Sequence, residues 1–170
     1  MRIARRALLI GGSFVALLAV ASVASFLGLY LPAARHVSSA LAEVPDELHP
    51  PPATFVRATL CVHPNGVSHI AARRLLSASA NTGGRALAWA VRYCVWTKAV
   101  QWRSTDGGVG LFANTMIHKA GSGLVAGAQA YFGKAPAELT PSEVLDLIVA
   151  DKSPDGLAPE RLEALRRRCL

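Results

Sequence analysis

The sequence predicts a mainly α-helical protein in which one helical domain follows a single N-terminal transmembrane helix. Three observations support this prediction: a long uncharged run near the N-terminus, apolar residues that recur at helical spacing, and a complete helix-start signature at residues 139–144. No segment alternates apolar and polar residues convincingly, as a half-exposed strand would. With 170 residues, the chain has room for one domain beyond the first helix.

The uncharged run extends from Ala7 to Leu31 and contains 25 residues. About 20 apolar helical residues cross a bilayer core, so this run is long enough to span a membrane with some tilt. Three arginines precede it and only Arg35 follows closely, which places the N-terminus in the cytoplasm. We therefore expect a single-pass protein of the inner (plasma) membrane with a periplasmic, extracytoplasmic domain. A cleaved signal peptide is the alternative, because small residues at 19–24 suit a cleavage site.

The predicted organisation has three parts. Residues 1–32 form the cytoplasmic N-terminus and the anchor, which Pro32 ends; residues 33–53 form a tether; and residues 54–170 form the folded domain. The tether is expected because its proline triplet at 50–52 favours extended backbone and does not fit inside a helix.

Within the domain, the expected helices are His69–Ala80, Arg85–Trp102, 124–132, 141–151 and Pro159–Arg168. The fourth is the most clearly marked, because Thr140 is an N-cap residue, Pro141 takes the first helical position and Glu143 completes a capping box. The second is apolar on two faces, which is typical of a buried helix. Its aromatic row also suits a membrane interface, where tryptophan and tyrosine are enriched.

Charge is unevenly distributed along the chain, whose formal net charge is +7. Between Leu48 and Thr105 there are seven arginines and lysines but no aspartate or glutamate. Outside the cytoplasm, nucleic acid is not an expected partner, whereas the membrane itself, anionic lipid headgroups or a lipid-linked diphosphate fit this charge.

Cysteine and histidine patterns predict neither a disulfide framework nor a metal site. Cys61, Cys94 and Cys169 are odd in number and lack metal-ligand spacing; one pair can oxidise outside the cytoplasm, but buried free thiols are the preferred interpretation. The five histidines have no ligand spacing with acids or cysteines, so we expect no metal and no cofactor.

Residues 121–134 read GSGLVAGAQAYFGK, and residues 104–114 read STDGGVGLFAN. The first run resembles the last motif of the peptidoglycan glycosyltransferases (glycosyltransferase family 51, the transglycosylase domain of penicillin-binding proteins), and the second resembles an upstream segment of the same family. The motif positions in this chain are Asn114, Gly121, Gly123, Gln129, Tyr131, Phe132, Gly133 and Lys134. Lys119 falls at or beside the family's arginine. The likeness continues to the C-terminus and covers residues 104–170 well.

The resemblance implies a lysozyme-like helical fold beside a membrane, acting on lipid II, an undecaprenyl-diphosphate disaccharide-peptide. The N-terminal half matches poorly: His63-Pro64 stand where the family has its general-base glutamate, and the second functional glutamate falls near Arg92. A positioned general base contributes about 10²–10⁴-fold in rate. We therefore expect a divergent, truncated member with little or no catalysis, a pseudoenzyme.

Two residues remain candidates for a catalytic role, His63 and Asp106. Histidine acts as a base near neutral pH, but the preferred interpretation of His63 is a loop residue in a His-Pro-Asn-Gly turn. Asp106 precedes Gly107-Gly108 and fits a turn or cap better than an acid catalyst.

The basic residues Lys119, Arg92, Arg73 and Arg74 are candidates to bind the diphosphate through charge-assisted hydrogen bonds. A solvated basic face near anionic lipid explains the same residues equally well. The leading prediction is a membrane-anchored domain that binds lipid II or cell-wall synthesis proteins with little or no catalysis. The alternatives are an active, divergent transglycosylase that uses His63 or Asp106, and a structural membrane-tethered domain.

Overall fold

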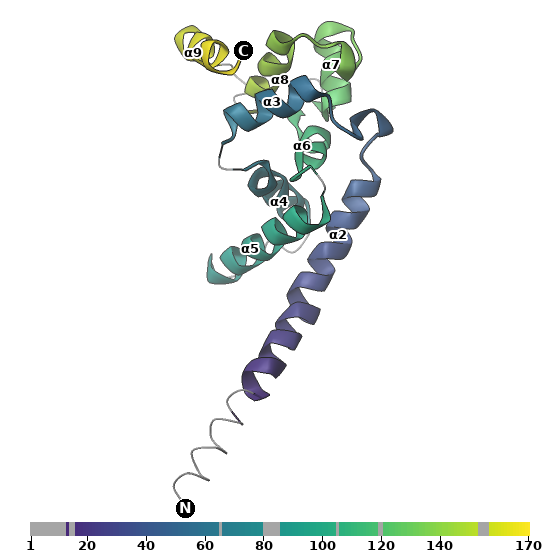
Figure 1. Cartoon of the computed structure of the whole chain (residues 1–170), viewed down its shortest axis with the longest axis vertical. Helices are drawn as coiled ribbons and strands as arrows, with labels where there is room; N and C mark the ends of the chain where they lie inside the picture. Colours follow the sequence, from purple (N-terminus) through teal and green to yellow (C-terminus); the bar gives the residue numbers. More distant parts are fainter. Residues whose placement is uncertain are drawn as a thin grey trace, which may run out of the picture.

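The computed structural model of the chain describes residue 13 and residues 16–64, 66–79, 86–104, 106–118, 121–152 and 157–170. These residues form a mainly helical protein, as predicted (Figure 1). In chain order the elements are η1 (Phe26–Tyr30), α2 (Leu31–Ala42), η2 (Asp46–Leu48), α3 (Ala53–Val62), α4 (Val67–Ala78), α5 (Ala86–Arg103), α6 (Val109–Thr115), β1 (Ile117–His118), β2 (Gly121–Ser122), α7 (Leu124–Phe132), η3 (Pro136–Glu138), α8 (Pro141–Lys152) and α9 (Pro159–Cys169). The antiparallel pair β1–β2 was not expected, because two-residue strands are too short to show alternation.

One long apolar helix begins this part of the chain and runs from Ala16 to Ala42 through η1 and α2. Its 27 residues are long and apolar enough to cross a membrane, although a signal sequence near an N-terminus has the same properties. Figure 1 shows this helix extending well beyond the rest of the domain, so most of its N-terminal half has no protein around it.

The helix does not end at Pro32, and the residues that follow it are not an extended tether but partly helical and packed in the domain. Pro32 lies in the first turn of α2, directly after the π-helical turn η1. Proline does not fit a regular α-helix because its ring meets the carbonyl four residues earlier, and the wider π turn relieves this contact. The helix therefore continues, and it buries Ala33, Ala34 and Val37 in the domain, where α2 packs on α5.

The core of the domain lies where α3 packs on α8 and where α4 packs on α6. In α3, the buried residues recur at helical spacing; they are Phe55, Ala58, Thr59 and Val62. The Phe55 ring stacks on Phe112 of α6, with the ring centroids 6.1 Å apart. The expected helices at 69–80 and 85–102 are present as α4 and α5, each within two residues of its expected ends where the structure describes them.

The capping box before α8 is confirmed. The Glu143 N–H donates to Thr140 Oγ1 at 3.3 Å, and the Glu143 carboxylate accepts the Thr140 N–H at 2.8 Å. Leu139 and Val144 are both buried, as expected for residues that flank such a cap. Lys134 donates to Glu143 at 2.6 Å, and this hydrogen bond together with those from Thr140 lowers the pKa of Glu143 to about 2.

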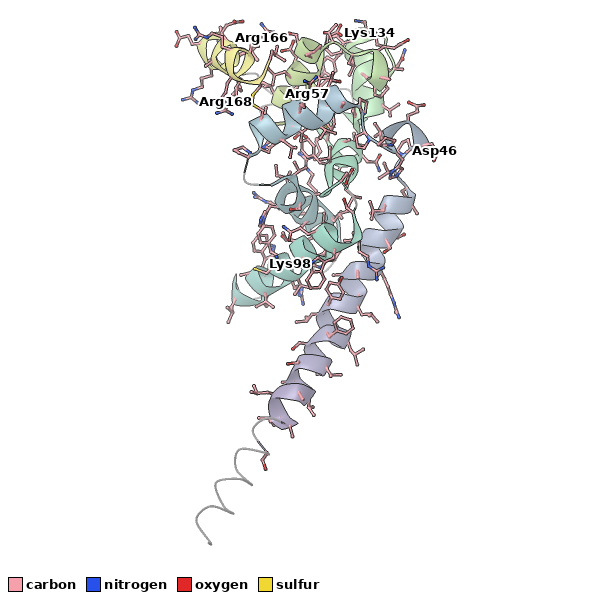
Figure 2. All side chains as sticks on the ribbon, in the orientation of Figure 1. Asp46, Arg57, Lys98, Lys134, Arg166 and Arg168 are labelled. Carbon is pink, nitrogen blue, oxygen red and sulfur yellow. A yellow bond between two sulfur atoms is a disulfide. The ribbon has the colours of Figure 1, made fainter. Side chains whose placement is uncertain are left out.

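A disulfide between Cys61 of α3 and Cys169 of α9 fastens the C-terminal helix to the domain. Arg168 also donates to the Cys61 carbonyl oxygen at 2.9 Å, and Figure 2 shows Arg168 beside α3. The prediction of buried free thiols is wrong, because two cysteines are bridged and Cys94 is exposed. The bridged pair is 108 residues apart, so only the tertiary fold brings the two together.

The prediction that α5 is mostly buried is also wrong. Ala99 and Val100, in its C-terminal half, are fully buried, whereas Leu87 and Val91 are 77% and 43% exposed. Among the described residues, the helix packs on α4 and on the long helix of η1 and α2 along one side, and its N-terminal half projects beyond them (Figure 1). An apolar second face therefore remains on the surface.

Candidate functional site

The candidate site is a groove of about 700 Å³ between α4 and the segment that joins α6 to β2. Its lining residues are Ile70, Arg73, Arg74, Leu75, Ser77, Ala78, Asn114, Thr115, Ile117 and Ser122. This lining, as far as the structure describes it, includes two arginines, three hydroxyls and one amide, but no carboxylate. Two of the hydroxyls, on Ser77 and Thr115, already donate to carbonyl oxygens. A phosphate in the groove would therefore depend mainly on guanidinium donors.

The two arginines of the groove have different roles, although they are adjacent in α4. Arg74 is committed to the fold: it donates to the Thr115 carbonyl oxygen at 2.9 Å and to Asp151 Oδ1 at 2.6 Å. The Asp151 side chain is 3% exposed and also accepts the Ile117 N–H at 2.7 Å. Arg74 thus ties α4 to α6 and α8 and shapes the floor of the groove.

Arg73 is exposed, and its guanidinium makes no hydrogen bond or ion pair with any residue that the structure describes. Ser77 lies four residues further along α4, so both side chains are on one face of this helix. The Ser77 hydroxyl donates to the Arg73 carbonyl oxygen at 2.8 Å, so its hydrogen is already used. The group on this face that an anion in the groove would meet is therefore the uncommitted Arg73 guanidinium.

The opposite wall of the groove depends on glycines of the predicted motif. Gly123 has a φ of +90°, and a Cβ atom added to it would lie 3.3 Å from the Asn114 carbonyl oxygen. Gly121 has a φ of +133°, within the two-residue strand that pairs with His118. Both glycines let the chain turn back tightly against α6, which places Asn114 and Ser122 on the same wall.

The rest of the motif stabilises the fold and does not line the groove. His118 Nε2 lies 2.9 Å from the Gly123 carbonyl oxygen, and the Tyr131 ring meets the His118 ring edge-on at 5.8 Å. A Cβ atom on Gly127 would lie 2.5 Å from His118 Nε2, so any larger residue there would displace the His118 ring. Gly133 caps α7 with a φ of +64°, a conformation that favours glycine.

The remaining motif residues, Gln129, Phe132 and Lys134, also contact nearby parts of the fold and do not line the groove. Gln129 is exposed, and its carbonyl oxygen accepts the Gly133 N–H at 3.0 Å. Phe132 is half-buried against the core, while Lys134 pairs with Glu143 at the start of α8. Of the motif positions, only Asn114 lines the groove.

His63 lies outside the groove lined by Arg73 and Arg74, which we call the arginine groove. It follows α3 and accepts the Gly66 N–H through its carbonyl oxygen at 3.1 Å, which is the turn expected there. Its ring packs edge-on against Phe112 at 5.4 Å. A neighbouring cavity of about 430 Å³ is lined by His63, His69 and Tyr93, and His69 Nδ1 lies 3.1 Å from the Tyr93 hydroxyl.

The structure places Asp106 at the start of α6 as a cap. Its carboxylate accepts the Gly108 N–H at 3.0 Å, the Gly110 N–H at 2.6 Å and the Ser104 hydroxyl. Burial alone would raise the pKa of Asp106, but the hydrogen bonds from Ser104, Gly110 and Gly108 outweigh it, so the pKa lies below its ordinary value. Asp106 is not in the lining of the groove.

The structure does not bring all four predicted diphosphate ligands together. Arg92 lines a separate pocket of about 300 Å³ beside η1 and α2, together with Gly28, His36 and Trp96. Lys119 lies outside the described residues. Among the residues that the structure does describe, no group of histidine, cysteine, aspartate or glutamate is arranged to hold a metal ion.

Sequence reasoning did not identify the hydroxyl groups of the groove. Ser77 has a signal, because it lies one helical turn after Arg73. Thr115 and Ser122 have no such signal in the sequence. For Ser122, only the pairing of β1 with β2 brings the residue to this wall. No protein-family model, curated protein or solved structure matches this chain.

Proposed function

We propose that the protein is a membrane-anchored, extracytoplasmic binding domain that holds the diphosphate of a lipid-linked sugar in the arginine groove, with little or no catalysis. Lipid II is the ligand that the resemblance to peptidoglycan glycosyltransferases suggests. The same resemblance suggests a lysozyme-like arrangement of the helices. In this proposal the domain supplies lipid II, or a docking surface, to cell-wall synthesis proteins.

The observation that carries this proposal is the uncommitted Arg73 guanidinium in a groove whose described lining residues include no carboxylate. Arginine binds phosphate oxygens through two parallel charge-assisted hydrogen bonds. Transfer of a sugar requires, in addition, a base within hydrogen-bond reach of the acceptor hydroxyl. The groove offers an arginine for the phosphate but, in its described lining, no carboxylate to serve as the base.

The proposed location follows from two further features. The apolar helix Ala16–Ala42 suits a membrane anchor, and the three arginines before it favour a cytoplasmic N-terminus. The disulfide between Cys61 and Cys169 suits an oxidising compartment outside the cytoplasm. Together they favour a single-pass protein of the inner membrane with its domain in the periplasm.

The test uses the full-length protein in detergent, immobilised and incubated with labelled lipid II. We expect the wild type to retain the label and to form no glycan chains. Arg73→Ala should weaken retention, whereas Arg57→Ala, which removes an exposed arginine of α3 outside the groove, should not. Equal retention by both variants would contradict the role of the groove. No retention by the wild type would favour a purely structural domain.

A second candidate function is a divergent, active transglycosylase. One observation favours it: the cavity beside His63 and the arginine groove share Ile70 in their linings, so a histidine lies in the neighbouring cavity. In that case, the same incubation would yield glycan chains, and His63→Ala would abolish them. This result would replace the binding proposal with an enzymatic one.

A further inference from the structure

α5 carries an exposed apolar face that no described part of the chain covers. Leu87, Val91 and Trp102 are 77%, 43% and 68% exposed. Cys94 and Lys98, both exposed, lie on the same face, because these five positions follow one another at spacings of three and four residues. Exposed apolar patches on a folded domain mark surfaces of interaction.

This face continues the apolar surface of the anchor helix. The Trp102 ring lies 5.4 Å from the Tyr30 ring, and Tyr30 in turn stacks on Phe26 at 5.2 Å. Figure 1 shows α5 against the anchor helix and sloping toward its N-terminal end, further in that direction than the other labelled helices of the domain. A bilayer that surrounds the anchor therefore meets α5 first.

The charges of α5 match an anionic lipid surface. The helix contains Arg92, Lys98 and Arg103 but no aspartate or glutamate. Lys98 lies within the apolar face, where its aliphatic stem can cover apolar surface while its ammonium group reaches the headgroups. Trp102 is of the residue type that prefers the boundary between headgroups and acyl chains.

From these features we infer that α5 is a second membrane contact, with its exposed face in the interfacial layer of an anionic bilayer. The inference rests on the membrane anchoring in the proposed function, but not on the groove or its ligand. Two attachments, the anchor helix and α5, prevent the domain from rotating about the anchor. The arginine groove is then held at a fixed height and orientation above the headgroups.

The test is quenching of tryptophan fluorescence by brominated acyl chains, in vesicles of phosphatidylethanolamine and phosphatidylglycerol. The full-length variant keeps Trp102 as its one tryptophan, with the other two changed to phenylalanine. The matched control lacks all three and carries Tyr131→Trp, because Tyr131 is 45% exposed on α7, at the far end of the domain from the anchor (Figure 1). We expect several-fold stronger quenching, and a blue-shifted emission, at position 102 than at position 131.

A second measurement needs no tryptophan substitution. Cys94 is a free, exposed thiol on the same face, so it can carry a bimane label in the otherwise unchanged chain. Brominated lipid should quench this label more strongly than the same label on Tyr131→Cys in a Cys94→Ser chain. Quenching no stronger than at position 131 in both experiments would overturn the inference.

Two further outcomes are distinguishable. Efficient Cys94–Cys94 cross-linking of reconstituted protein would show that a second copy covers this face, and would overturn the inference while leaving the anchor intact. Loss of the protein from the vesicles on alkaline carbonate washing would contradict the anchor itself, and with it both proposals.

Discussion

Arg74 offers the sharpest test of how the groove is built, because its partners are buried and well defined. The guanidinium bonds to Asp151 and to the Thr115 carbonyl oxygen, and the Asp151 side chain is 3% exposed. Arg74→Met leaves this carboxylate in the interior with the Ile117 N–H as its remaining donor among the described residues. Removing one partner of a buried ion pair costs about 3–5 kcal/mol. Since domains of this size are stable by about 5–15 kcal/mol, the loss should be severe.

The assay is urea unfolding of the full-length protein in detergent micelles, followed by far-ultraviolet circular dichroism. Arg73→Met is the matched control, because it removes the same group from the next residue, where the structure shows no partner. We expect a change within about 0.5 kcal/mol for this exposed position. The double variant Arg74→Met/Asp151→Asn should recover part of the lost stability, since it removes the buried charge but keeps an acceptor for Ile117. If Arg74→Met costs no more than Arg73→Met, the distinction between a structural and a binding arginine is wrong.

Three further predictions concern the scaffold. Replacing both Cys61 and Cys169 with alanine should lower the free energy of unfolding by roughly 2–5 kcal/mol, because the bridge closes a loop of 108 residues. Titration of free thiols in the unfolded wild type should find one thiol per chain. The hydrogen bonds that lower the pKa of Asp106 stabilise the fold at pH values above its ordinary pKa of 3.8. The free energy of unfolding should therefore fall as the pH drops below about 4. In Asp106→Asn, unfolding measured over the same pH range should depend less on pH. Gly127→Ala should cost about 1–3 kcal/mol in the same measurement, since the added methyl group would lie 2.5 Å from His118 Nε2; a neutral effect would contradict this contact.

Local signals in the sequence predicted local structure well. The capping box of α8 depends on residues three positions apart, and the C-cap of α7 depends on one glycine, so neither needs knowledge of the tertiary fold. The mainly helical class and the long apolar N-terminal helix follow from periodicity and composition for the same reason.

Most of the errors concern contacts between distant parts of the chain. Pro32 marks a helix end in most sequences, and only the preceding π turn and the burial of Val37 against the domain keep this helix continuous. The two apolar faces of α5 predict burial, but the domain covers only one of them. The pairing of Cys61 with Cys169 likewise requires the fold.

The candidate site was predictable in kind but not in detail. An absence of acids and a cluster of arginines indicated an anion site in this part of the chain. The sequence does not distinguish Arg73 from Arg74, because their difference lies in Asp151, which is 77 residues away from Arg74. Nor does the sequence show that Arg92 lines a different pocket, beside η1 and α2.

The most direct test of the central claim is to measure lipid II retention and glycan chain formation in one incubation, with undecaprenyl phosphate and a neutral lipid as competitors. The proposal predicts that the full-length protein retains lipid II, that undecaprenyl phosphate competes better than the neutral lipid, and that no chains form over hours. Steady chain growth, or equal displacement by the neutral lipid, would contradict a groove that binds the diphosphate without transferring the sugar.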